Sequence, residues 1–116
     1  MNARALLASL ALATLATPVS AHAFLQRAIP GAGETVANSP KEIVLDFTEP
    51  LKPAFSEVGV TDAAGHHVEA AHSTTNGASM RVSLKVLATG VYRVSWHAVS
   101  VDNHRTDGAY SFTIKP

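Results

Sequence analysis

The run VYRVSWHA, residues 91–98, carries a clear signal of secondary structure. Apolar and polar residues alternate along it, so that Tyr92, Val94 and Trp96 share one face. A period of two is typical of a β-strand with one face buried and the other in solvent. The run therefore predicts a half-buried strand.

Four other runs of the chain show the same alternation, at residues 42–47, 57–61, 80–86 and 109–115. The residues expected to face inward are Ile43, Leu45, Phe47, Val58, Val60, Met80, Val82, Leu84, Val86, Tyr110, Phe112 and Ile114. Clusters of turn-forming residues separate the runs, and residues 49–55 hold two prolines, which cannot donate to a sheet ladder. We expect an all-β fold, a single antiparallel β-sandwich or barrel, with residues 49–55 as a non-strand crossover.

The N-terminus MNARALLASLALATLATPVSA, residues 1–21, has the features of a signal peptide. Arg4 gives a positive start, residues 5–17 form an apolar run too short to span a bilayer, and Val19-Ser20-Ala21 fits a cleavage site. We expect residues 1–21 to be removed and residues 22–116 to form one exported domain. Two alternatives are cleavage after Ala23 and a short helix that stays attached.

Composition excludes several classes of function. After cleavage the chain has eight basic and nine acidic side chains, so its net charge is about −1. Such a balance argues against a nucleic-acid partner and against an anionic membrane surface. No later segment is apolar enough to span a membrane, and with no cysteine the domain must rely on its core.

Both ends of the exported chain offer metal ligands. A freed His22 presents its α-amine beside its imidazole, and Nδ1 of that ring closes a six-membered chelate with the amine. Asp102 and His104 lie between two predicted strands, and in an extended segment residues i and i+2 point to the same side. Amine, imidazole and carboxylate suit Cu(II), which favours tetragonal nitrogen and oxygen sites. The sequence thus indicates a site for one Cu(II) ion.

Longer motifs of the chain are similar to those of a known family. The start HAFLQRAIPGAGETV, the segment VLDFTEPLKPAFSEVGV, the run GVYRVSWHAVSVDNH and the ending GAYSFTI resemble the CopC family of periplasmic copper-binding proteins. The resemblance implies a Greek-key (Ig-like) β-sandwich with His22, Asp102 and His104 as Cu(II) ligands. It also implies that Glu49 is an outer-shell or weak axial group, although an exposed turn acid is an equal alternative.

The same resemblance implies a role without chemistry. It predicts a monomer of the periplasm, not an enzyme, that sequesters copper, gives copper resistance or delivers copper to an inner-membrane permease of the CopD type. Some members carry a methionine-rich Cu(I) site. Here Met80 is the one methionine after the leader, and its alternation with Val82 and Leu84 predicts that it lies in the core. No Cu(I) site is expected. Residues 105–107 replace a proline common in the family, and we expect a changed loop there, with Asp107 as a turn acid.

Other histidines and other functions stay open. His66, His67 and His72 lie in polar turns, where a second metal site or a solvated hairpin is possible. His97 is expected on the face opposite Trp96, as a surface residue or a group behind the copper site. Two further functions compete, namely an oxidative copper enzyme built on a histidine brace and a structural β-sandwich without metal.

Overall fold

The computed structural model describes residues 24–116, which form eight β-strands and one short 3-10 helix. The strands are β1 (Leu25–Ile29), β2 (Thr35–Val36), β3 (Glu42–Phe47), β4 (Glu57–Thr61), β5 (Thr74–Asn76), β6 (Ser79–Ser83), β7 (Gly90–Val99) and β8 (Arg105–Ile114), and the helix η1 is Pro53–Phe55. Within these residues no helix has the length and apolar character needed to cross a membrane.

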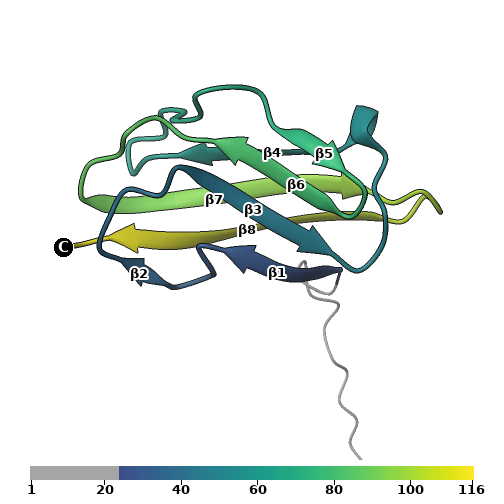
Figure 1. Cartoon of the computed structure of the whole chain (residues 1–116), viewed down its shortest axis with the longest axis horizontal. Coiled ribbons are helices and arrows are strands. Elements are labelled where there is room, and N and C mark those ends of the chain that lie inside the picture. Colours follow the sequence, from purple (N-terminus) through teal and green to yellow (C-terminus); the bar gives the residue numbers. More distant parts are fainter. Residues whose placement is uncertain (1–23) are drawn as a thin grey trace, which may run out of the picture.

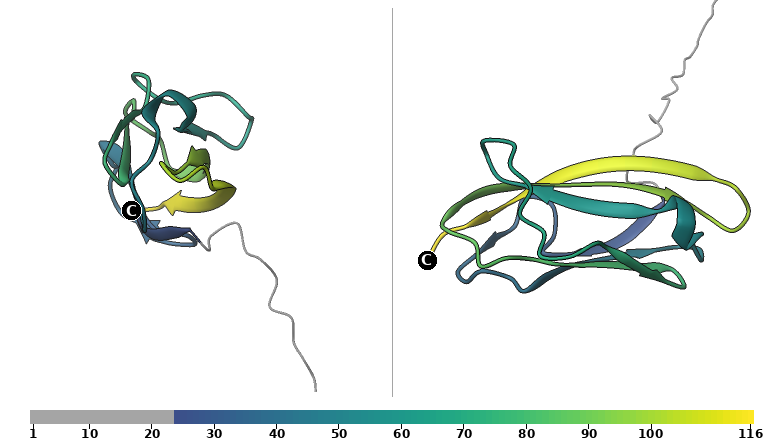
Figure 2. Two further views of the ribbon diagram at one scale, coloured as in Figure 1. Left: turned by 90° about the vertical axis from the view of Figure 1, so that its right-hand side faces the viewer. Right: turned by 90° about the horizontal axis from the view of Figure 1, so that it is seen from above.

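The strands form two facing four-stranded sheets, shown in Figures 1 and 2. Sheet A has the order β1-β3-β6-β5 and sheet B the order β2-β8-β7-β4. The fold is a β-sandwich, which decides between the two architectures that the sequence left open. One pair, β2 with β8, is parallel, whereas only antiparallel pairs were expected.

Three of the strands, β1, β2 and β5, were not anticipated from the sequence, and β5 lies in residues 73–79, which were expected to form a turn. The ladder between β1 and β3 shifts its register between Leu25 and Arg27, and such a bulge breaks the period of two that reveals a strand. Strands β2 and β5 have two and three residues, too few to show any period. All three strands lie at the edges of their sheets.

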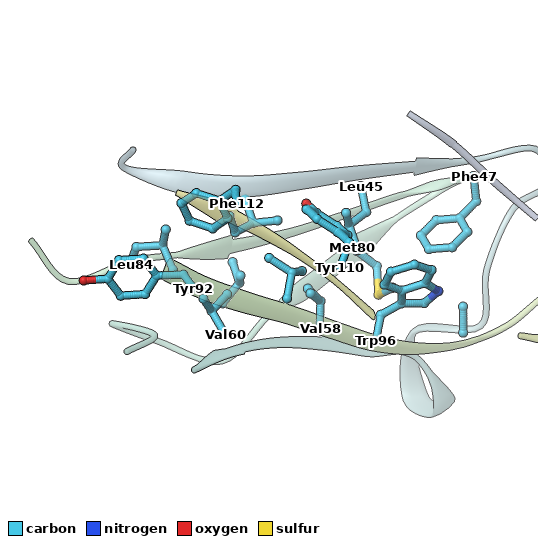
Figure 3. Packing of buried hydrophobic residues seen from close by; sticks show 14 of the residues in the cluster. Leu45, Phe47, Val58, Val60, Met80, Leu84, Tyr92, Trp96, Tyr110 and Phe112 are labelled. Atoms are coloured by element: carbon cyan, nitrogen blue, oxygen red, sulfur yellow. The ribbon is translucent and has the colours of Figure 1, made fainter. Parts of the chain in front are cut away.

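The space between the sheets is filled by the inward faces of the predicted strands, as Figure 3 shows. The ring centroid of Trp96 in sheet B lies 6.3 Å from that of Phe47 in sheet A and 6.2 Å from that of Tyr110 in sheet B. Full burial of a large apolar side chain contributes about 1.5–3 kcal/mol. Met80 is completely buried, as its alternation predicted. Every residue expected to face inward is buried, with one exception, and Leu51 and Leu87 from outside the alternating runs also belong to the core.

The exception is Val86, which was expected inside but is 95% exposed. Strand β6 ends at Ser83, whose partner Glu42 is the first residue of β3. Beyond that pair the chain leaves the sheet, and the alternation no longer corresponds to two faces. Leu87 occupies the next buried position instead.

Strands β7 and β8 form a long hairpin that continues further than expected. Val99 pairs with Arg105, so the connecting loop is Ser100–His104. The predicted loop change at residues 105–107 was wrong, because these residues belong to β8. Asp107 is therefore not a turn acid, and it pairs with His97 across the ladder.

Close packing at the end of this hairpin depends on Gly108. The residue pairs with Trp96, and a Cβ built on Gly108 would lie 2.3 Å from Cζ2 of the indole ring. Only glycine lets the ring lie against β8 at this point. The contact between Trp96 and Gly108 holds β7 and β8 together close to the loop that connects them.

Several segments meet at one end of the sandwich. Strands β3 and β7 end there, and β1, β4 and β8 begin there (Figure 1). The loop Ser100–His104, the crossover after β3 and the start of the described chain are therefore neighbours. The predicted crossover contains η1 and one isolated bridge, from Leu51 to Ser100.

Candidate metal centre

The loop between β7 and β8 is folded around Ser100, which is completely buried. Its N–H donates to the carbonyl of His104 at 2.9 Å, and its hydroxyl oxygen accepts the N–H of His104 at 3.0 Å. The same hydroxyl donates to the carboxylate of Asp102. Asn103 adopts a φ of 70°, in the left-handed region that asparagine tolerates, and so reverses the chain.

Asp102 and His104 lie together as expected, but the segment that holds them is not extended, although an extended segment had been predicted. The ring nitrogen Nδ1 of His104 is 3.2 Å from both carboxylate oxygens of Asp102. An extended segment would hold the two side chains parallel, whereas here a tight turn brings them into contact. The turn, stabilised by Ser100, sets the geometry.

The crossover after β3 lies against this loop through backbone hydrogen bonds. The N–H of Lys52 donates to the carbonyl of Val99 at 2.7 Å, and the N–H of Val101 donates to the carbonyl of Pro50 at 3.0 Å. The ammonium group of Lys52 donates to the side-chain oxygen of Asn103. These contacts place Glu49 beside the turn.

Glu49, Asp102 and His104 form the group whose geometry suits a metal ion. Each offers one ligand atom, and the three atoms lie within 4.8 Å of one another. Among residues 24–116 no other three histidine or acidic side chains converge in this way. The side chains of His104 and Asp102 are 75% and 49% exposed, so an ion can reach them from solvent.

The two carboxyl groups of this centre have opposite pKa shifts. The hydrogen bond from Ser100 is the main cause that lowers the pKa of Asp102, and contacts with Glu49 and His104 act in the same direction. Partial desolvation, then the neighbouring Asp102, raises the pKa of Glu49. The negative charge of Asp102, which disfavours ionisation of the neighbouring Glu49, also favours the binding of a cation between them.

The start of the described chain is fixed next to Glu49. The carbonyl of Phe24 accepts the N–H of Thr48 at 3.2 Å, and the ring of Phe24 lies 5.6 Å from that of Phe47. Residues 1–23, and with them His22 and the cleavage site, lie outside the described residues. The prediction that His22 supplies two ligands therefore stays a prediction.

The other histidines are on the surface. His66 lies 3.5 Å from Asp62, and His67 lies 3.0 Å from Glu69. His97 is exposed on the outer face of β7, opposite Trp96, as expected. None of these histidines belongs to the group around Asp102.

Reasoning from sequence missed Ser100 and Lys52. The signal for Ser100 was its spacing, because a serine two residues before an aspartate at the end of a strand is typical of a side-chain-stabilised turn. Lys52 had no local signal, since its contact with Asn103 joins segments that only the fold brings together.

Comparison with known proteins gives the family. The CopC domain model matches residues 25–115. Protein YobA of Escherichia coli (strain K12) is 36% identical over 98% of this chain and 98% of its own. The crystal structure of CopC from Methylosinus trichosporium OB3b has 32% identity and a TM-score of 0.74, covering 80% of this chain and 93% of its own.

A second solved structure is PcoC, a methionine-rich copper resistance protein from Escherichia coli. It has 35% identity and a TM-score of 0.70, covering 79% of this chain and 97% of its own. The chain described here belongs to the CopC family, as its motifs indicated.

Proposed function

We propose that this protein binds one Cu(II) ion at the end of the sandwich where Asp102 and His104 meet. The ligands are the α-amine and Nδ1 of a freed His22, a ring nitrogen of His104 and an oxygen of Asp102. Glu49 lies next to them as an outer-shell or weak axial group. The proposal rests on one observation, that ligand atoms of Glu49, Asp102 and His104 lie within 4.8 Å of one another.

The position of Phe24 supports the part played by His22. Consecutive Cα atoms are about 3.8 Å apart, so the Cα of His22 lies within about 8 Å of that of Phe24. Phe24 is itself hydrogen-bonded to Thr48, the neighbour of Glu49. Covalent connection alone thus keeps the amine within reach of the centre, provided that cleavage follows Ala21.

The chemistry of the centre supports Cu(II) over Cu(I). Imidazole, amine and carboxylate are ligands that Cu(II) prefers, whereas Cu(I) is selected by thiolate and thioether groups. Met80 is completely buried between the sheets and offers no thioether at the surface. We expect one Cu(II) ion and no methionine-rich Cu(I) site.

The biological role that fits is copper binding in the periplasm. The relatives include a copper resistance protein of Escherichia coli and a copper transport protein, CutJ, of Bacillus subtilis. We propose that the protein, as a monomer, sequesters Cu(II) or delivers it to an inner-membrane permease of the CopD type. Copper is here a cargo, and no catalytic step is needed.

An oxidative enzyme with a histidine brace is the second candidate, since it too would use His22 and His104. The carboxylate of Asp102 disfavours it, because Asp102 lies 3.2 Å from the His104 ring and would take a copper position that oxygen needs. Robust copper-dependent reduction of oxygen to hydrogen peroxide with ascorbate as the electron donor, or oxidation of a polysaccharide, would establish the enzyme instead.

Substitution of His104 tests the proposal. His104→Ala should weaken Cu(II) binding by orders of magnitude and leave the thermal unfolding of the metal-free protein nearly unchanged, because the side chain is exposed. His66→Ala is the matched control, since His66 is also exposed and also lies beside a carboxylate. Equal affinities of the two variants for Cu(II) would contradict the proposed site.

A further inference from the structure

A groove of about 320 Å³ lies on the outer face of sheet B, between β4 and the connection that leads to β5. Three of the chain's histidines line it, His67 and His72 from the connection and His97 from β7, together with Glu69. Neither Asp102 nor His104 lines this groove. The groove is therefore separate from the candidate metal centre.

The carboxylate of Glu69 is built into the wall of the groove. Its Oε2 accepts the N–H of Val60 at 2.5 Å, and its side chain is 18% exposed. Gly59 makes the space, because a Cβ on Gly59 would lie 2.9 Å from that oxygen. Strand β4 thus carries a glycine where the carboxylate has to lie against its backbone.

Glu69 in turn orients His67. Nδ1 of His67 is 3.0 Å from the same Oε2, so the carboxylate favours the proton on Nδ1 and leaves the lone pair on Nε2. Histidines that bind metals usually donate their other ring N–H to a carboxylate or carbonyl in this way. The pair has the arrangement of a metal ligand with its supporting group.

The second and third imidazoles line the same groove, His72 from the connection and His97 from β7. His97 pairs with Glu57 of β4 in the ladder, two residues along from Gly59 on the outer face. His72 and His97 are exposed, and exposed side chains change rotamer within nanoseconds. Their nitrogens are not yet converged, so binding would draw the two rings toward Nε2 of His67.

We propose that this groove is a second metal site, for a divalent transition-metal ion of the kind that imidazole prefers, such as Cu²⁺ or Zn²⁺. The ligands are ring nitrogens of His67, His72 and His97, and Glu69 is a positioning residue. The proposal uses none of the residues of the first centre and does not rest on the function proposed there.

The test uses a variant in which the first centre is disabled, a chain that begins at Phe24 and carries Asp102→Ala and His104→Ala. In this protein, titration with Cu²⁺ should broaden the imidazole NMR signals of His67, His72 and His97 at substoichiometric metal. The signals of His66 should broaden much less, although His66 is the neighbour of His67 in sequence and similarly exposed, at 79% against 74%. Zn²⁺ should shift the same three sets of signals.

Two further substitutions make the test specific. His67→Ala should abolish the effect on His72 and His97, and Glu69→Gln should weaken the affinity about 10- to 100-fold, the range seen when a supporting carboxylate is lost. His66→Ala should change nothing. Equal broadening of His66, or Zn²⁺ and Cu²⁺ binding that is unchanged in His67→Ala, would overturn the proposal. Failure of the first centre would appear instead as unperturbed His104 signals in the unsubstituted protein.

Discussion

The hydroxyl of the buried Ser100 donates a hydrogen bond to the carboxylate of Asp102, two residues further along the chain. The same oxygen accepts the backbone N–H of His104 at 3.0 Å. One buried atom therefore holds both residues that converge with Glu49. The relative position of Asp102 and His104 is thus set by the fold of the turn around Ser100.

Removal of this hydroxyl should damage both the turn and the copper site. Ser100→Ala leaves the N–H of His104 without its partner, a loss that costs about 1–3 kcal/mol for a buried group. Copper affinity should fall about 10- to 100-fold, as for other groups that orient ligands. Urea unfolding and Cu(II) titration measure the two effects.

The pKa of Asp102 provides an independent reading of the same variant. The hydrogen bond from Ser100 lowers this pKa by stabilising the charged form, so Ser100→Ala should raise it toward the ordinary value. NMR titration of the metal-free protein measures the shift. Ser95→Ala, at an exposed position of β7, is the control, and an equal shift in both variants would contradict the role of Ser100.

Gly108 should not tolerate even a methyl group. In Gly108→Ala the new Cβ would lie 2.3 Å from the Trp96 ring, so the ring or the strand must move. Overpacking of this kind typically costs about 1–3 kcal/mol. Trp96 is the single tryptophan, and its fluorescence reports both unfolding and any displacement of the ring.

Gly31→Ala is the matched control for this substitution, since a Cβ there would make only ordinary contacts, at 3.5 Å and beyond. If Gly108→Ala unfolds at the same urea concentration as Gly31→Ala and keeps the same emission spectrum, the packing of Trp96 against β8 is not as described.

Copper affinity should decrease as the pH falls from about 8 to 6. The free α-amine has an ordinary pKa of about 7.7–8.0, and it must lose its proton to bind the ion. Asp102 is not the limiting group in this range, because its pKa lies below the usual value and it stays ionised. Competition titrations at several pH values test this expectation, and an affinity that does not change between pH 8 and 6 would exclude the amine as a ligand.

One residue added before His22 should weaken Cu(II) binding by orders of magnitude. The extension converts the amine into an amide and moves the new amine away from the chelate. A residue added after Pro116 controls for the change in length, because the C-terminus follows β8 at the far end of the sandwich (Figure 1). Equal affinities of the two extended proteins would mean that the centre works without the N-terminal amine.

Alternation predicted the strands whose two faces differ in environment. Residues 42–47 and 57–61 match β3 and β4 residue for residue. Val86 was misplaced because its strand had lost its ladder partner, which a single run cannot reveal. Strand β1 was missed because its bulge disturbs the period.

At the candidate centre, the sequence indicated which residues could be ligands, but not the contacts that hold these residues together. Asp102 and His104 are close in sequence, so their contact could be anticipated. The backbone pairing of Lys52 with Val99 and of Val101 with Pro50 joins segments far apart in the chain, and these contacts place Glu49 beside Asp102 and His104. Such backbone pairing leaves no pattern in side-chain chemistry.

The most direct test of the copper proposal is the native mass of the exported protein, with and without one equivalent of Cu(II). We predict a chain that begins at His22 and gains one copper ion. A chain that begins at Phe24, or one that begins at His22 and gains no copper, would contradict the proposal.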